Sequence, residues 1–304
     1  MKKLIDKLAG DERVREAVEK SPATRELISR YIAGRDLDEL MPVVDNHVWK
    51  GLDVSINFLP KQLGRVQNLR YVVDDYKQIL QRISDGGFSH KAELSLRLST
   101  LGMGQVFPEI TLELAREITR TATNLDIDVC LDMEDFEHIH TVLVVHDQLH
   151  QDFPRIGVTV QANLKRSLND VERLAEKNAR IRIVKGSYAA PDADSFDSRL
   201  KVDQSYVHCL RKAFEGGGVP LVATHDPRLI EISEALVKKH GYSDYEYQMF
   251  YGVRTFEQRR LVDTGRTCRT QLPFGPDWIG YYLRRAEDRP SNLLLFMRSL
   301  IGKR

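Results

Sequence analysis

The chain has 304 residues, of which 42% are hydrophobic and 29% charged, and its formal net charge is +1 at pH 7. That length provides one large globular domain or two small ones, and the balanced charge gives no reason to expect a nucleic acid or an acidic membrane as partner. The three cysteines form no CxxC pair, and no apolar run approaches the roughly 20 residues that cross a bilayer. We therefore expect a soluble, cytoplasmic protein that touches a membrane at most peripherally.

Residues 1–45 carry helical signals and no strand signal. Ser21 and Pro22 can cap and begin a helix, and apolar residues then recur at helical spacing as far as Ile32. We expect residues 1–45 to form a helical arm on a main domain that spans 46–304.

From residue 53 onward, short β-branched and aliphatic runs alternate with amphipathic segments. Eight runs are predicted strands: Asp53–Leu59, Glu93–Thr100, Ile127–Met133, Ile156–Ala162, Ile181–Ser187, Pro220–His225, Tyr245–Tyr251 and Thr267–Pro273. Predicted helices between them include Leu112–Asn124, Glu137–Gln151, Leu168–Asn178, Val202–Glu215, Pro227–His240 and Thr255–Thr264. This alternation over about 250 residues is typical of a (β/α)8 TIM barrel. An open doubly wound sheet is the alternative, but no GxGxxG fingerprint follows the first strand.

Polar residues gather where the predicted strands end. They are Arg97, Asp132, Glu134, Gln161, Asn163, Lys185, Tyr188, His225, Asp226 and Gln271. The carboxyl ends of barrel strands form the mouth at which ligands bind. The sequence therefore predicts a binding site there.

Two groups of cations have a functional and a structural interpretation. Arg182 and Lys185 lie three residues apart on the fifth predicted strand, and a buried cation there needs an anion or a polar ligand, because leaving it unpaired is costly. An ion pair with Asp132 or Glu134 would serve equally well. Arg284 and Arg285, on a helix after the last strand, can grip a carboxylate or pair with acidic neighbours on the same helix.

Two other kinds of site are disfavoured. His146 and His150 have a spacing that can bind zinc, but HDQLH lacks the glutamate of the zinc-protease motif. We expect them to be solvated surface histidines on a helix outside the barrel and predict no metal site. A serine hydrolase is disfavoured because no GxSxG elbow occurs.

Together these segments resemble the FAD-dependent proline dehydrogenases, a family of distorted (β/α)8 barrels, in their monofunctional bacterial form. The matching stretches occur in the family's order: LSLRLSTLG (94–102), LDMEDFE (131–137), VTVQANLKRS (158–167), RIVKGSY (182–188), ATHD (223–226), YQMFYGVR (247–254) and PFGPDW with YYLRRAEDRPSNL (273–293). RIVKGSY followed far downstream by YxxRR is the most specific combination.

The resemblance implies roles at matching positions. Arg182 corresponds to an arginine near flavin N5, and the other implied cofactor contacts are Gln161, Lys185, Gly186, Tyr188, Thr224 and His225. Arg284 and Arg285 correspond to the pair that binds the substrate carboxylate, Tyr281 to a tyrosine on the substrate ring, and Asp132 to an acid behind the substrate. The implied reaction transfers a hydride from proline to flavin N5 and yields pyrroline-5-carboxylate, with a quinone or another carrier as the electron acceptor.

Departures from the family pattern cluster at the substrate end. Arg97, which we place among the catalytic residues, replaces a lysine. Lys61 replaces a glutamate that in the family pairs with the first of the two arginines that bind the substrate carboxylate. Pocket positions also differ: Ser187 replaces alanine, Phe250 replaces leucine, Gln271 replaces tyrosine, and Asn163 replaces a further tyrosine. Three interpretations stay open: an ordinary proline dehydrogenase, the same chemistry on a related ring such as hydroxyproline, or a barrel that binds a ligand without catalysis. Metal-dependent hydrolysis by Asp132, Glu134 and His225 is a weaker alternative.

Overall fold

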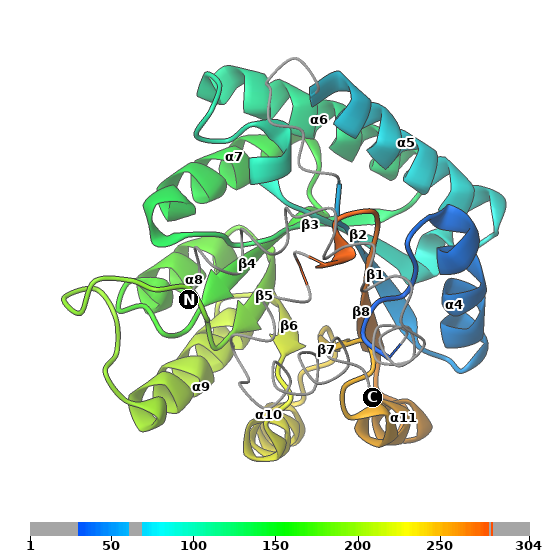
Figure 1. Ribbon diagram of the computed structural model, residues 1–304. Coiled ribbons are helices and arrows are strands. Elements are labelled where there is room, and N and C mark those ends of the chain that lie inside the picture. Colours follow the sequence, from blue (N-terminus) through cyan, green and yellow to red (C-terminus); the bar gives the residue numbers. More distant parts are fainter. Residues whose placement is uncertain (1–29, 61–68, 280, 282–304) are drawn as a thin grey trace, which may run out of the picture.

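The computed structural model describes residues 30–60, 69–279 and 281, and its centre is a closed barrel of eight parallel strands (Figure 1). The strands pair in chain order, and β8 pairs with β1 along the full length of β1. Their bounds are β1 Asp53–Phe58, β2 Ala92–Leu96, β3 Asp128–Leu131, β4 Gly157–Gln161, β5 Arg180–Val184, β6 Val219–Ala223, β7 Glu246–Phe250 and β8 Cys268–Phe274. The predicted (β/α)8 fold is confirmed.

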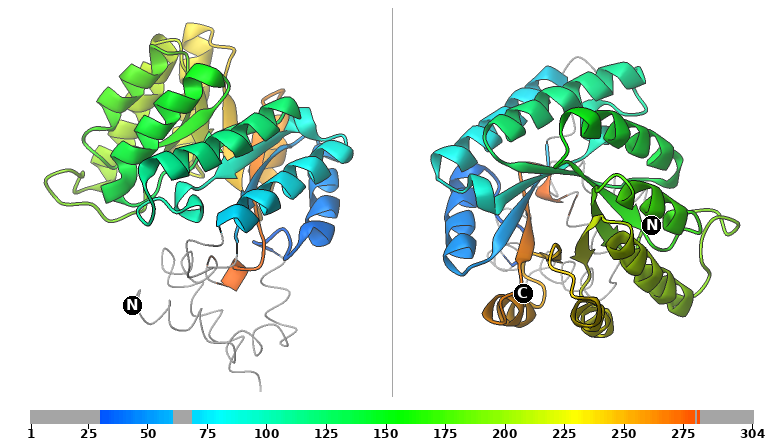
Figure 2. Two further views of the ribbon diagram at one scale, coloured as in Figure 1. Left: turned by 90° about the horizontal axis from the view of Figure 1, so that it is seen from above. Right: turned by 180° about the vertical axis from the view of Figure 1, so that it is seen from behind.

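Helices surround the strands on the outside (Figure 2). Their bounds are α4 Leu37–Trp49, α5 Leu69–Asp85, α6 Pro108–Asn124, α7 Ile139–Asp152, α8 Ser167–Ala175, α9 Arg199–Glu215, α10 Pro227–His240 and α11 Thr255–Asp263, with short 3-10 helices η2 Ser89–Lys91, η3 Leu98–Leu101 and η4 Phe136–His138. Local signals set both ends of α10. Asp226 caps its N-terminus by accepting from the Arg228 amide, Pro227 is its first residue, and Gly241 ends it at φ 67°.

The second predicted strand is too long. β2 ends at Leu96, and Leu98–Leu101 form η3, which stops at Gly102 with φ 85°. α5 has no counterpart among the helices expected above, although its buried face recurs at helical spacing.

The N-terminal region is described from residue 30. Helix α4 begins after Asp36, whose carboxylate accepts from the Glu39 amide, and it buries Leu40 and Val44. It runs without a break through residue 45 and lies beside β1 and α5 (Figure 1). The division of the chain at residue 45 stays a prediction, because residues 1–29 lie outside the described residues.

The expectation for the paired histidines is wrong for His146. Its side chain on α7 is wholly buried, with Nε2 3.3 Å from the Ile156 carbonyl oxygen and its ring stacked on His150 at 5.3 Å between centroids. An apolar inward position of the helix has thus been filled by an imidazole. Among the described residues, no group of three or more His, Cys, Asp or Glu is arranged to hold a metal.

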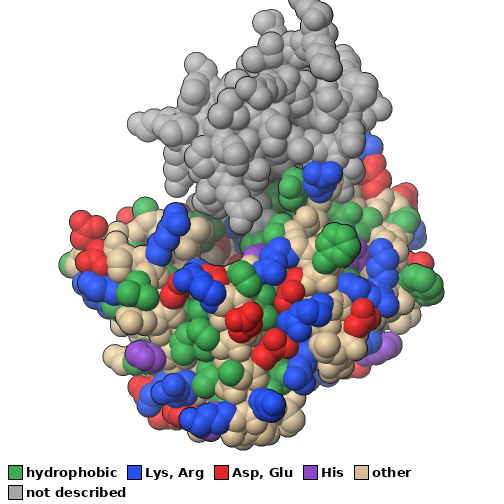
Figure 3. Space-filling model, turned by 90° about the horizontal axis from the view of Figure 1, so that it is seen from below, with side chains coloured by type: hydrophobic (Ala, Val, Ile, Leu, Met, Phe, Trp, Pro, Cys, Tyr) green, Lys and Arg blue, Asp and Glu red, His purple; other side chains and the backbone are tan. Residues whose placement is uncertain are grey.

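The surface and the cysteines agree with the composition. On the face seen in Figure 3, acidic and basic side chains are interspersed rather than gathered into one patch. Cys130, Cys209 and Cys268 are all buried and free. No helix within the described parts of the chain combines the length and apolarity that crossing a bilayer requires.

The inside of the barrel is polar. Alternate residues of a strand point to opposite faces, and the outward set, such as Val54, Ile56 and Leu94, packs against the helices. The inward set includes Asp53, Ser55, Asn57, Glu93, Ser95, Arg180, Arg182, Glu246, Gln248 and Arg269, of which all but Arg180 are at most 7% exposed. Barrel interiors are usually filled by branched apolar residues. Here ion pairs and hydrogen bonds take their place.

Candidate active site

Predicted site residues from four strands meet at the barrel mouth. Asp132, just after β3, accepts a 2.6 Å hydrogen bond from Arg182 Nη1 and lies 3.8 Å from Arg97 Nε. Arg97 Nη2 also donates to the Tyr188 hydroxyl at 3.2 Å. Gln271 on β8 is linked to Asp132 through Ser95, which forms a hydrogen bond with each of them. The convergence expected from the strand ends is therefore present in the fold.

Arg182 is fully engaged by protein partners. Its side chain is 5% exposed. Nε donates to Gln248, Nη1 to Asp132 and Ser95, and Nη2 to Glu93 and Ser55, at distances of 2.6 to 3.4 Å. These contacts use all five N–H groups of the guanidinium. Of the two ion pairs considered from the sequence, the one with Asp132 forms.

Glu134 connects neighbouring elements of the barrel instead of pairing with Arg182. Its Oε1 accepts from the Ser99 amide at 2.9 Å, and its carbonyl oxygen accepts from Gln161 Nε2 at 3.4 Å. It thereby ties the end of β3 to η3 and to β4. Gln161 is 4% exposed, and its Oε1 has no hydrogen-bond partner among the described residues.

Sequence reasoning missed Ser55, Glu93, Ser95 and Gln248, which hold Arg182 in place. Glu93 and Ser95 occupy alternate positions of β2, with Arg97 two residues further on just after the strand, and Glu246 alternates with Gln248 along β7. Polar residues at every second position of a barrel strand indicate a polar interior, and that was the available signal. Burial raises the pKa of Glu93, but the charges of Arg182, Arg180 and Arg269 outweigh burial and hold it below its ordinary value.

The orientation of the Gln271 amide follows from its neighbour. Ser95 Oγ donates its one hydrogen to Asp132 at 2.6 Å, because a carboxylate can only accept. Ser95 must therefore accept from Gln271, which presents Nε2 to it at 3.2 Å. Gln271 Oε1 has no partner among the described residues and is left as an acceptor. Asn57, on β1 and 3% exposed, likewise has an Oδ1 atom without a partner in the described structure.

The residues expected to hold a cofactor lie at the ends of β4 to β6. Gly186 has φ 95°, and a Cβ there would fall 1.9 Å from Asn163 Oδ1, so only a bare backbone fits. Lys185 pairs with Asp203, and with Asp226 at 2.8 Å. Thr224 is 4% exposed and accepts from the Asp226 amide at 3.1 Å.

His225 and Phe250 form one unit. Their rings are stacked with centroids 5.1 Å apart, and His225 Nε2 accepts from the Phe250 amide at 2.9 Å. That bond places the proton of a neutral imidazole on Nδ1. A substrate-pocket position and a cofactor position from the sequence are thus in direct contact.

The structure describes Tyr281, Ser187 and Tyr188 but not the remaining predicted residues. Tyr281 is buried, with 7% exposure, whereas Ser187 is exposed. Burial raises the pKa of Tyr188. Lys61, Arg284 and Arg285 lie outside the described residues.

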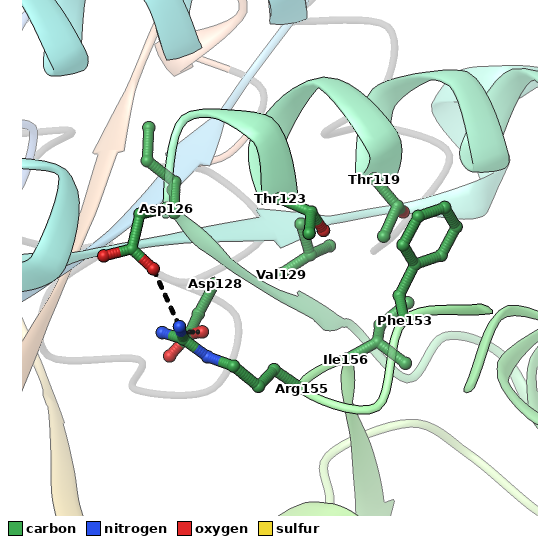
Figure 4. Close-up of a pocket in the computed structure, with 9 residues that line it drawn as sticks. Thr119, Thr123, Asp126, Asp128, Val129, Phe153, Arg155 and Ile156 are labelled. Atoms are coloured by element: carbon green, nitrogen blue, oxygen red, sulfur yellow. Dashed lines mark hydrogen bonds and ion pairs between the residues drawn. The ribbon is translucent and has the colours of Figure 1, made fainter. Parts of the chain in front are cut away.

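A small hollow lies at the opposite ends of the strands (Figure 4). It is lined by Thr119 and Thr123 of α6, by the beginning of β3, and by Phe153 and Ile156 ahead of β4. Arg155 also lines it and pairs with Asp126 at 2.8 Å and Asp128 at 2.6 Å. The charged side chains that line the hollow thus pair with one another, and the hollow is separate from the barrel mouth.

Comparison with known proteins agrees with the geometry. Residues 42–293 match the family model described as proline dehydrogenase. Proline dehydrogenase 1 of Bacillus subtilis (strain 168) is 29% identical over 286 residues, which cover 93% of this chain and 94% of the relative. Proline dehydrogenase of Deinococcus radiodurans is 28% identical over 281 residues, 90% of each chain.

Solved structures support the fold. Proline utilization A of Bdellovibrio bacteriovorus matches with a TM-score of 0.79 at 19% identity, covering 86% of this chain and 32% of that one. The counterpart from Bradyrhizobium japonicum has a TM-score of 0.73, also at 19% identity, and covers 91% and 32%. This chain therefore spans about a third of the length of those proteins.

Proposed function

This chain belongs to the proline dehydrogenase family, and from that premise we propose that it oxidises proline to pyrroline-5-carboxylate with FAD as the hydride acceptor. The observation that carries the proposal is the ion pair of the buried Arg182 with Asp132 at the mouth, beside Arg97 and Gln271. Such a cluster provides fixed charge in a site sheltered from water, where electrostatic stabilisation is strongest. The metal-dependent alternative has less support, because Asp132 and Glu134 are occupied by hydrogen bonds within the protein.

The cofactor half of the mouth fits a flavin. Gly186 offers bare backbone, Lys185 a cation beside it, and Gln161 an amide oxygen with no partner in the described structure. We assign these residues, with Tyr188, Thr224 and His225, to FAD, and place Arg182 near N5 of its ring. When bound, FAD would supply the acceptor for the hydride. The positive charge of Arg182 would favour the electron-rich reduced ring.

The other half of the mouth is assigned to the substrate. Arg284 and Arg285 would bind the carboxylate as a bidentate pair, with Tyr281 against the ring and Arg97 and Asp132 nearby. Phe250, Gln271 and Ser187 would complete the pocket. Held in this way, the ring carbon next to nitrogen is oriented toward the flavin and shielded from water.

A ring-hydroxylated substrate such as hydroxyproline is the second candidate. The observation that favours it is the pair of amide oxygens on Gln271 and Asn57, which have no donor among the described residues. A hydroxyl on the ring could donate to either oxygen. Acceptors sheltered from water discriminate between substrates because leaving them unpaired is costly.

The cellular setting is proposed from the same observations. Three buried free cysteines suit a reducing compartment, and we assign the protein to the cytoplasm. Electrons would pass to a quinone at a membrane surface, through peripheral contact, or to another carrier.

The proposal is tested by product analysis. The purified protein, supplied with proline and an artificial electron acceptor, should form a cyclic imine. An aromatic aldehyde that carries an amino group traps this imine as a coloured adduct. Flavin released by denaturation should be FAD. A colourless protein that takes up no added FAD would instead support a binding barrel without catalysis.

A further inference from the structure

Glu93 lies at the centre of the barrel and joins four strands. It is completely buried on β2. Oε1 accepts from Arg182 Nη2 at 2.6 Å, from Ser55 Oγ at 2.9 Å and from Gln248 Nε2 at 3.4 Å, while Oε2 accepts from Arg180 Nη2 at 3.0 Å. The donors come from β1, β5 and β7 and so surround the carboxylate on several sides.

The two carboxylates that hold Arg182 are not equivalent. Asp132 lies at the mouth, with a side chain 13% exposed, and binds Nη1, whereas Glu93 is 0% exposed and binds Nη2. Gln248 bonds both partners, accepting from Arg182 Nε at 2.6 Å and donating to Glu93. The plane of the guanidinium is therefore determined jointly by Asp132 at the mouth and Glu93 beneath it.

We propose that Glu93 is a positioning residue for Arg182, which fixes the guanidinium and partly offsets its charge, and so sets how strongly Arg182 favours the reduced flavin. The inference rests on the proposed function, because it needs a flavin beside Arg182. An anion close to that arginine reduces the positive potential at the ring. Removing the charge while keeping an oxygen for Nη2 should make the flavin easier to reduce.

Glu93→Gln in the flavin-loaded protein tests this, with Asp128→Asn as the matched control. Asp128 also pairs with Arg180, at 2.9 Å, but makes no contact with Arg182. The midpoint potential of the bound flavin is measured by dye-equilibrated reduction without proline. It should be more positive in Glu93→Gln than in the wild type and unchanged in Asp128→Asn. An equal shift in both variants, or no shift in either, would overturn the proposal.

If Glu93→Gln does not fold, Glu93→Asp provides the test. The shorter side chain keeps the charge but withdraws it from Arg182, so kcat should fall about tenfold or more while KM for proline changes less than about threefold. An unchanged kcat would contradict the assignment. Wild-type protein that proline cannot reduce would contradict the proposed function itself, whereas reducible wild type with unaffected Glu93 variants would contradict only this inference.

Discussion

Arg182 and Asp132 face each other at 2.6 Å where the strands open into the barrel mouth. Asp132→Asn keeps the shape of the side chain but removes the charge that balances the guanidinium. We expect the rate of flavin reduction by proline to fall about 100-fold, because the guanidinium of Arg182 is less well positioned, and the free energy of unfolding to fall by about 2 kcal/mol, because one charge-assisted hydrogen bond to a buried cation is weakened.

Stopped-flow absorbance and urea denaturation measure these two effects. Asp135→Asn, an exposed carboxylate in the same loop, is the control and should behave as the wild type. A reduction rate for Asp132→Asn within twofold of the control would remove Asp132 from the site.

Gly186 tests the cofactor half. Gly186→Ala should cost about 1–2 kcal/mol for the left-handed backbone alone and more for the collision with Asn163. We expect the variant to be purified with little flavin. Gly241→Ala is the control, because Gly241 has φ 67° but no neighbour within 4 Å of a new Cβ. Flavin content measured by absorbance should stay normal there; a loss in both variants would point to general instability.

Gln271 tests the second substrate candidate. Gln271→Met keeps the length of the side chain but removes the acceptor Oε1. If that oxygen binds a ring hydroxyl, kcat/KM for 4-hydroxyproline relative to proline should fall about tenfold, which corresponds to one hydrogen bond. Steady-state assays of both substrates give the ratio, and Gln148→Met on the exposed face of α7 is the control. A constant ratio would leave proline as the only supported substrate.

His146 predicts a pH dependence of stability. Burial lowers the pKa of His146 in the folded state, and its contacts with Asp147 and the Ile156 carbonyl only partly oppose this. The folded protein therefore keeps the imidazole neutral, while the unfolded chain takes up a proton below about pH 6.5. The stability that His146 contributes is complete above that pH and is lost as the pH falls toward the lower folded value.

The measurement is the melting temperature of the wild type and His146→Gln between about pH 5 and pH 8. The melting temperature of both proteins should fall somewhat in acid because other groups titrate, but that of the variant should fall less. Parallel curves would show that His146 does not titrate differently in the folded and unfolded states. His150→Gln changes only the partly exposed neighbour. Comparing the two variants therefore separates the effect of the buried His146 from that of His150.

The barrel could be predicted from the sequence because most strands are short runs rich in branched apolar residues, and most are followed by a recognisable helical pattern. The error at β2 has a local cause: Leu98–Leu101 are as apolar as the strand, but the chain turns into η3 before Gly102. Apolar runs alone do not distinguish these two conformations.

The mouth could be predicted only in part. Arg97, Asp132 and Arg182 were recognisable from their places on the strands, whereas Glu93 and Gln248 lie deeper, at positions that barrels usually fill with apolar side chains. Their partners come from distant strands, and Arg182 reaches Ser55 across 127 residues of sequence. Only the closed barrel brings them together.

Anaerobic titration of the flavin-loaded protein with proline shows whether the bound flavin accepts a hydride from proline. We expect proline to bleach the visible absorption band of the flavin, and Arg182→Ala to slow the bleaching. An unchanged spectrum after excess proline, in protein whose flavin dithionite still reduces, would contradict this expectation.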